Sequence, residues 1–326
     1  MLGWGIIGTG DISDRLVEDL TAVPGARITA VWGRSDDRAR AFAGAHGIPH
    51  ATSSLAELLH LPDVDVVYIA TPAHTHADIA IEALRAGRHV LIEKPVATSA
   101  ADAERVYAEA VVAKRFAMEA MWMRFNPLHV DLLARIDDGL LGEISSVRAS
   151  FGTPFQARGR ILTPADGGST LRDRGIYPIT LAYWLLGAPA EIAAVASFAG
   201  ETDVEGHATL EWSSAFAQLA WSGVRFLDLS ATVAGERGWL VLDPMFWAGT
   251  SARIHAGTAE RIFVAPERVE HPREGNGYRP MIAGVTQAIS EGRLEHPWHT
   301  HADSIAITRT MDAILAGVPN APASPQ

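Results

Sequence analysis

The chain has 326 residues, of which 48% are hydrophobic and 20% are charged, and its formal net charge at pH 7 is -11. This length favours two domains over a single core, and the acidic balance argues against a nucleic-acid partner, because phosphate contacts need a basic face. The absence of cysteine excludes disulfides, thiolate metal sites and a cysteine nucleophile, and it fits a reducing compartment, so we expect a cytoplasmic protein.

Strands and helices alternate in the first third of the chain. The apolar segment 2–7 leads into a glycine-rich turn, so it is predicted as a first strand and not as an export signal. A helix is expected to follow and to end at Leu20. Further strands are predicted at 27–32, 65–70 and 89–92, and further helices at 36–46, 76–86 and 99–114. This alternation is typical of βαβ units around a parallel sheet. No apolar run approaches the roughly 20 residues that span a bilayer, so no membrane partner is expected.

The pattern changes after Met121, where we place the boundary between a Rossmann domain, 1–121, and a second domain, 122–326. Two helices are predicted at 127–139 and 172–186. Successive strands follow between 190 and 264, including 191–198, 207–212, 216–221 and 227–233, and two helices, 280–291 and 301–317, come last. The predicted fold class is therefore α/β, with a parallel sheet followed by an α+β domain that has a large open, mostly antiparallel sheet. The exposed face of that sheet is a candidate surface for a homodimer or higher homo-oligomer, with Trp212 and Trp221 as candidate contributors.

The turn after the first predicted strand fits a dinucleotide-binding loop, G-x-G-x-x-small. It consists of Gly8, Thr9, Gly10, Asp11, Ile12 and Ser13. The first glycine allows a tight turn, and the second lets backbone amides approach a pyrophosphate at a helix N-terminus. Ser13 replaces the usual third glycine or alanine and is small enough for close packing of helix on strand. The alternative is a glycine turn that binds no nucleotide.

The end of the second predicted strand bears on the choice of cofactor. NAD enzymes usually have an acidic residue there for the ribose 2′-hydroxyl, whereas this chain has Arg34 and Ser35. A guanidinium beside a small hydroxyl suits a 2′-phosphate, so NADP is preferred and NAD remains possible. Asp36 and Asp37 follow at once, but they are as easily explained as residues of a helix N-terminus.

A lysine follows the strand predicted at 89–92, within Glu93-Lys94-Pro95. In open parallel sheets, ligands bind at the carboxyl ends of strands, and Lys94 is expected at such an end. A lysine near a nicotinamide can orient an alcohol oxygen and stabilise its developing charge. The alternative is a buried structural lysine whose carboxylate partner is Glu93 or Asp173.

The glycine loop, the segment Ala70-Thr71-Pro72 with His76, and Glu93-Lys94-Pro95 together resemble the glucose–fructose oxidoreductase/inositol dehydrogenase (Gfo/Idh/MocA) family. The resemblance covers nearly the whole chain and implies a Rossmann domain joined to a domain with an open, largely antiparallel sheet. It implies that Lys94 is the catalytic lysine and that the peptide before Pro95 is cis. We expect Thr71, Pro72, His76 and Glu93 to lie beside the cofactor, although His76 could instead cap the next helix.

Two further segments are similar to the dihydrodiol dehydrogenase and NADP-linked aldose dehydrogenase branch of this family. The first is 119–125, with the pattern Glu-Ala-x-x-x-Arg-Phe, and the second is Gly167-Gly168 followed by 171–178, with the pattern Asp-x-Gly-x-Tyr. Other branches have histidine at the position of Tyr177, often with aspartate three residues later, where this chain has Thr180.

The second segment suggests a proton relay. Asp173 and Tyr177 are four residues apart on a predicted helix, hence on one face, from which a carboxylate and a phenol could serve Lys94. The alternatives are a packing aromatic for Tyr177 and a helix cap for Asp173. Trp122 and Arg124 are placed near cofactor and substrate, although a core position explains Trp122 equally well.

These observations predict an NADP-preferring oxidoreductase that moves hydride between nicotinamide and a secondary alcohol or carbonyl. The expected substrate is a small molecule, a sugar, polyol or cyclic diol, with Lys94, Tyr177 and Asp173 as catalytic residues. The rivals are a glycoside hydrolase of the same family that uses nicotinamide transiently, and a non-catalytic NAD(P)-binding sensor or regulator. No metal is expected, because the histidines at 74 and 76, and at 296, 299 and 301, lack matching ligands.

Overall fold

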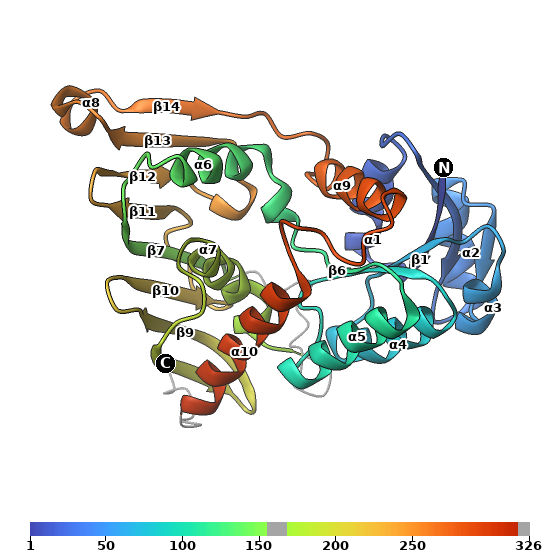
Figure 1. Ribbon diagram of the computed structural model, residues 1–326. Coiled ribbons are helices and arrows are strands. Elements are labelled where there is room, and N and C mark those ends of the chain that lie inside the picture. The colour runs from blue at the N-terminus through green and yellow to red at the C-terminus, as the bar shows by residue number, and fades with distance from the viewer. Residues whose placement is uncertain (155–167, 319–326) are drawn as a thin grey trace. The chain divides into compact units, whose positions relative to one another are not determined.

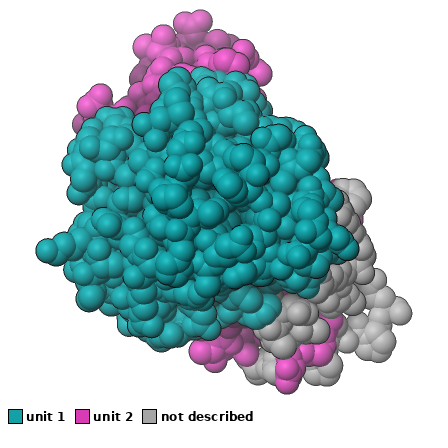
Figure 2. All heavy atoms as spheres, turned by 90° about the vertical axis from the view of Figure 1, so that its right-hand side faces the viewer, with its two compact units in different colours: residues 1–125, 273–305 teal, residues 126–272, 306–326 magenta. Residues whose placement is uncertain are grey.

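The computed structural model describes residues 1–154 and 168–318 (Figure 1). These residues form two compact units, coloured in Figure 2. Unit 1 comprises Met1–Phe125 and Arg273–Ile305, and unit 2 comprises the described parts of Asn126–Pro272 and Ala306–Gln326. The sequence placed 273–305 in the second domain, whereas in the structure this segment packs with the N-terminal residues. The domain boundary near 121 stays a prediction, since compactness alone does not define a folding domain.

Unit 1 is built on a six-stranded parallel sheet in the order β3-β2-β1-β4-β5-β6. Its strands are β1 (Leu2–Ile7), β2 (Ala26–Trp32), β3 (His50–Thr52), β4 (Val66–Ile69), β5 (His89–Ile92) and β6 (Ala117–Glu119). After β3, at one edge, the chain returns to the middle of the sheet and continues as β4 on the other side of β1. The strand order therefore reverses between β1 and β4, and this is the switch point where ligands bind in open α/β sheets. The predicted Rossmann-type sheet is confirmed.

Helices cover both faces of this sheet (Figure 1). They are α1 (Asp11–Leu20), α2 (Asp36–His46), α3 (Leu55–His60), α4 (His76–Arg85), α5 (Ala100–Ala113) and α9 (Arg279–Ser290), with 3-10 turns η1 (Ala73–Thr75) and η2 (Trp122–Phe125). Alternation along β1 separates two cores, because Trp4 and Ile6 join the cluster under α1 and α9 while Ile7 joins the cluster under α4 and α5. Met281 and Val285 of α9 complete the first core, which explains why 273–305 belongs to unit 1.

Unit 2 is built on an eight-stranded sheet in the order β14-β13-β12-β11-β7-β10-β9-β8, in which only β7 and β10 run parallel to each other. Its strands are β7 (Ile144–Gly152), β8 (Glu191–Ala199), β9 (Thr202–Glu211), β10 (Phe216–Ser222), β11 (Ala231–Gly235), β12 (Gly238–Leu242), β13 (Ser251–Ala256) and β14 (Glu267–Glu270). The predicted large, mostly antiparallel sheet is therefore confirmed, although the sequence missed its central strand, β7.

The helical elements of unit 2 lie mainly over one face of its sheet (Figure 1). They are α6 (Pro127–Asp137), the π-helical turn η5 (Leu171–Gly175), α7 (Ile176–Leu186), η6 (Phe246–Ala248), α8 (Ala259–Phe263) and most of α10 (His301–Gly317), which starts in unit 1. None of the helices within the described ranges has the length and apolar character needed to cross a membrane.

Three sequence expectations for unit 2 were wrong. Trp221 is only 1% exposed, because it shares its side of β10 with the buried Ala217 and Leu219, so it does not lie on the open face. The strand expected at 227–233 begins at Ala231, since the Asp228 carboxylate accepts hydrogen bonds from Ser230 N and Oγ at 3.0 and 2.8 Å and so forms a turn. The strands expected up to residue 264 give way to α8.

Candidate functional site

The predicted dinucleotide loop joins β1 to α1. Gly8 has φ +120°, and a Cβ there would lie 2.5 Å from the carbonyl oxygen of Ala70. Both the backbone conformation and the lack of space therefore require glycine at this position. Gly10 precedes α1 as its N-cap, is exposed, and a Cβ there would meet no described atom within 4 Å. The loop thus leaves open space at the start of a ten-residue helix, where backbone amides can receive a pyrophosphate. These residues fit a dinucleotide.

The remaining positions of this loop have distinct surroundings. Thr9 lies close to Gly33, the residue that follows β2, because its Cγ2 would be 3.2 Å from a Cβ built at Gly33. Asp11 is exposed in the first turn of α1, and Ile12 packs against the core. Ser13 is fully buried and its hydroxyl has no hydrogen-bond partner among the described residues, so its small size serves close packing.

The end of β2 presents Arg34 and Ser35 to solvent. Arg34 forms no ion pair within the described part of the chain, whereas Ser35 caps α2 and accepts from Arg38 N at 3.4 Å. Asp36 receives the Ser53 hydroxyl at 2.5 Å and lies 3.8 Å from Arg40, and the hydrogen bond from Ser53 lowers the pKa of the Asp36 carboxyl. The Asp36 carboxylate therefore already has partners within the protein, while the exposed guanidinium of Arg34 can receive a phosphate.

His76 links the loops that follow β4 and β5. Its ring is 1% exposed, with Nδ1 at 2.8 Å from the carbonyl oxygen of Pro95 and Nε2 at 2.8 Å from that of Thr71. Burial lowers the pKa of His76, an effect that these two hydrogen bonds oppose. Thr71 is half-buried and its hydroxyl lies 2.6 Å from that of Thr75, whereas Pro72 is exposed. The cap of α4 involves no side chain, so His76 does not cap that helix.

Lys94 emerges at the carboxyl end of β5, as predicted, and is partly exposed. The peptide between Lys94 and Pro95 is cis, as the family resemblance implied. Glu93 is buried, accepts the Tyr68 hydroxyl at 2.5 Å through Oε1 and the Lys94 amide at 3.2 Å through Oε2. Burial raises the pKa of Glu93, which the Tyr68 hydrogen bond and the Lys94 charge counteract. The buried Glu93 carboxylate therefore holds the main chain of Lys94 through the hydrogen bond from the Lys94 amide.

The residues that follow β6 belong to the same unit. Trp122 is half-buried and its ring lies 5.5 Å from that of Tyr278, which supports the core interpretation of this tryptophan. Arg124 is partly exposed and its Nε donates to the carbonyl oxygen of Trp298 at 2.5 Å. Two buried partners of the acids near Lys94 were not predicted as such: Tyr68, which donates to Glu93, was not singled out, and His299, which contacts Glu119, was weighed only as a metal ligand. Neither lies in a motif, so no local signal marked them.

Tyr177 and Asp173 belong to unit 2. Tyr177 is 5% exposed on α7, whereas Asp173 lies on the π-turn η5 with 62% of its side chain exposed and its Oδ2 3.8 Å from Nε of Arg174. The expected continuous α-helix over 172–186 therefore starts with a π-turn, in which the backbone of Gly175 packs so closely that a Cβ would lie 2.6 Å from Leu171. Gly168 is buried, and Gly167 lies outside the described residues.

An aromatic cluster surrounds Tyr177. Phe151 stacks on Trp247 with ring centroids 3.6 Å apart, and the ring of Tyr177 lies 5.8 Å from Phe151 and 6.1 Å from Trp247. Arg174 lies 5.7 Å above the Phe151 ring and donates through Nη1 to the carbonyl oxygen of Ser222 at 2.6 Å. Because Lys94 and Tyr177 belong to different units, a relay between them remains a prediction.

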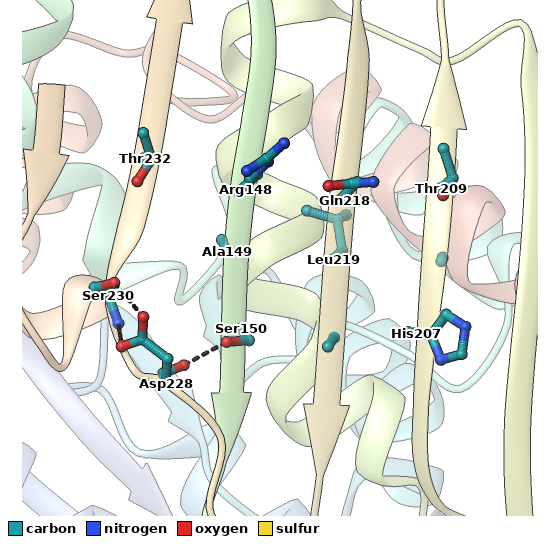
Figure 3. Close-up of a pocket in the computed structure, with 12 residues that line it drawn as sticks. Arg148, Ala149, Ser150, His207, Thr209, Gln218, Leu219, Asp228, Ser230 and Thr232 are labelled. Carbon is teal, nitrogen blue, oxygen red and sulfur yellow. Dashed lines mark hydrogen bonds between the residues drawn. The ribbon is translucent and has the colours of Figure 1, made fainter. Parts of the chain in front are cut away.

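A pocket of about 510 Å³ lies on the open face of the unit 2 sheet (Figure 3). Polar side chains from four neighbouring strands line it, among them Arg148, His207, Gln218 and Thr232. It includes none of the predicted site residues. No group of three or more histidine, aspartate or glutamate residues that could hold a metal ion occurs within the described ranges.

Comparisons with known proteins agree across the chain. Residues 2–120 match the model of an oxidoreductase family with an NAD-binding Rossmann fold, and residues 129–241 match the GFO/IDH/MocA C-terminal domain. The trans-1,2-dihydrobenzene-1,2-diol dehydrogenase of Xenopus laevis is 30% identical over 327 residues, which cover 96% of both chains. The dTDP-3,4-didehydro-2,6-dideoxy-alpha-D-glucose 3-reductase of Actinomadura kijaniata is 33% identical over 96% of this chain and 94% of that protein. A crystal structure of KijD10, a 3-ketoreductase from A. kijaniata in complex with NADP and TDP-benzene, superposes with a TM-score of 0.87 at 30% identity and covers 99% of each chain.

Proposed function

Since the chain belongs to the Gfo/Idh/MocA family of NAD(P)-dependent oxidoreductases, we propose that it transfers hydride between NADP and a secondary alcohol or carbonyl of a sugar, polyol or cyclic diol. The observation that carries the proposal is the position of Lys94. It is partly exposed at the carboxyl end of β5, in the same sheet whose β1 leads into the open glycine loop. Ligands of open α/β sheets bind at that edge.

The bound nicotinamide supplies the hydride chemistry, and the residues of the chain position the substrate and handle its proton. Lys94 Nζ orients the alcohol oxygen and stabilises the charge that develops on it as hydride leaves carbon. Tyr177 Oη takes the alcohol proton in the direction of oxidation while its own phenolic proton passes to the Asp173 carboxylate, and both transfers reverse in the direction of reduction. Glu93 and His76 hold the main chain on either side of Lys94.

The proposed substrate class rests on two supports. The relatives named above act on a dihydrobenzene diol and on a nucleotide-linked ketosugar, which share a ring that carries neighbouring oxygens. Phe151, Trp247 and Tyr177 form an aromatic cluster, and the flat apolar side of such a ring packs well on aromatic surfaces. We also propose a cytoplasmic location, on the absence of cysteine alone.

The test is a panel of aldoses, polyols and diols, incubated with NADP and with NAD while the absorbance of the reduced nicotinamide is followed. We expect net reduction of NADP with at least one ring substrate. Cleavage of a glycoside with tightly held cofactor and no net redox turnover would identify the rival hydrolase. Cofactor binding with no turnover on any substrate class would favour a sensor.

Arg34→Ala tests the cofactor preference. The exposed guanidinium of Arg34 is proposed to bind the 2′-phosphate, so its removal should weaken NADP binding by about 1.5–3 kcal/mol, the range of a charge-assisted hydrogen bond, and leave NAD binding almost unchanged. Titration of each cofactor against the folded protein measures both effects. Arg38→Ala, which removes an exposed arginine one turn away on α2, is the matched control. Equal losses for NADP and NAD would contradict the assignment.

We further propose that the open face of the unit 2 sheet forms a homo-oligomer interface. Val195 of β8, which pairs with the pocket residue His207, is 58% exposed. Phe216, two residues before the pocket residue Gln218 on β10, is 36% exposed. Val195→Lys should place a like charge on both copies and shift light-scattering mass from dimer towards monomer. Val112→Lys on α5, where Val112 is 77% exposed, should leave the mass unchanged. A wild-type protein that is monomeric at working concentration would refute this interface.

A further inference from the structure

The loop that carries Lys94 is tied to a buried acid. Glu119, the last residue of β6, accepts a hydrogen bond from the Val96 amide at 2.8 Å through Oε1. Its Oε2 lies 2.9 Å from Nε2 of His299, and both side chains are 0% exposed. Two residues beyond Lys94, the main chain therefore depends on a carboxylate whose second partner is an imidazole from the C-terminal segment of unit 1.

The surroundings of His299 determine where its proton lies. Nε2 faces Glu119 Oε2 and also lies 3.0 Å from the Ser304 hydroxyl, whereas Nδ1 is buried with no hydrogen-bond partner among the described residues. A proton on Nδ1 would be buried without an acceptor, so we assign the tautomer with hydrogen on Nε2. In that form His299 donates to Oε2 of Glu119, and Oε1 of Glu119 accepts from the Val96 amide.

We propose that His299 is a positioning residue for turnover, which acts through Glu119 and Val96 to fix the place of Lys94. The proposal rests on the proposed function, because it requires Lys94 to act on the substrate oxygen. Without the imidazole, the buried Glu119 carboxylate would have one hydrogen-bond donor fewer. It would then reorient or draw in water, and its hydrogen bond from the Val96 amide would weaken. Misplacement of a reacting group by about 1 Å can cost about 10²-fold in rate.

Other contacts keep the effect of His299 local. The main chain around the Lys94 loop is also held by His76 on the Pro95 carbonyl and by the Ala120 amide, which donates to the Ile92 carbonyl at 2.6 Å. The glycine loop that would receive the pyrophosphate lies on other elements, between β1 and α1. Loss of His299 should therefore lower kcat while the fold, KM and NADP affinity stay close to their wild-type values.

Three substitutions of His299 separate positioning from simple packing. His299→Leu removes the donor, and we expect kcat to fall about 10- to 100-fold in the folded enzyme. His299→Gln keeps an N–H that can reach Glu119 and should restore most of kcat, whereas His299→Asn, with the same amide on a shorter side chain, should not. If the Leu variant fails to fold, the Asn and Gln pair still decides the matter.

His301→Leu is the matched control, because His301 comes from the same segment and also contacts β6. Its Nε2 lies 3.0 Å from the Ala117 carbonyl oxygen and its ring stacks on Tyr107 at 4.2 Å, but neither contact involves the Glu119 carboxylate. It should lower thermal stability and leave kcat near the wild-type value. Steady-state kinetics, NADP titration and thermal melts on all variants measure these effects.

Two results would overturn the inference. The first is a kcat for His299→Leu or His299→Asn that stays near the wild-type value. The second is a fall in kcat for these variants that His301→Leu shows to the same extent. Lys94→Met, measured in parallel, separates this failure from failure of the proposed function. An inactive Lys94→Met beside unaffected His299 variants refutes only the role of His299, whereas an active Lys94→Met refutes the function on which it rests.

Discussion

Lys94→Met should lower turnover by at least about 10²-fold while NADP still binds, in line with the loss of a positioned proton-transfer group. Methionine keeps the length of the side chain and removes its cation, so the alcohol oxygen loses the group that would orient it and stabilise its charge. The glycine loop and Arg34 lie on other elements, so cofactor affinity should stay near the wild-type value. Steady-state kinetics with a substrate from the panel, together with NADP titration, measures both quantities.

The chain offers a matched control, because its only other lysine is Lys114. Lys114 is exposed at the C-cap of α5, and Lys114→Met makes the same chemical change away from the glycine loop and the β5 end. Its turnover should match the wild type. If Lys94→Met also kept near-normal turnover, Lys94 would be a structural residue and the mechanism would be wrong.

Tyr177→Phe should lower turnover by about 10²-fold through the loss of its hydroxyl alone. The phenyl ring can keep its neighbours Phe151 and Trp247, so the fold and cofactor affinity should be unchanged. The loss should appear in kcat and not in KM, since the hydrogen bond to the alcohol oxygen tightens in the transition state. The pH profile of kcat should lose one ionisation. Because Tyr177 and Lys94 would titrate together, that ionisation belongs to the pair and not to Tyr177 alone.

Two further variants sharpen the test of Tyr177. Tyr177→His should recover part of the lost activity with a lower pH optimum, because imidazole titrates nearer neutrality than phenol. Tyr183→Phe removes a hydroxyl from the same helix and should leave turnover unchanged. The deciding measurement is the single-turnover rate of hydride transfer. An unchanged rate in Tyr177→Phe would make this tyrosine a packing residue and leave the proton to Lys94, with or without Asp173.

Local signals in the sequence sufficed for most elements of unit 1. The apolar run 89–92 is bounded by Gly87 on one side and by Lys94-Pro95 on the other, and β5 has those bounds. Ser35 and Gly47 punctuate α2 as its N-cap and C-cap. Such signals act within a few residues, so they do not depend on the rest of the fold.

The sequence by itself determined the family, the two sheet types, the glycine loop and the position of Lys94 at a strand end, because each is read from short motifs or from local patterns along the chain. Tertiary structure alone decided the return of 273–305 to unit 1, the central place of β7 and the burial of Trp221. It also brought His299 to Glu119, 180 residues away in sequence. Pairing at that separation depends on how sheets and helices pack, and no local periodicity encodes it.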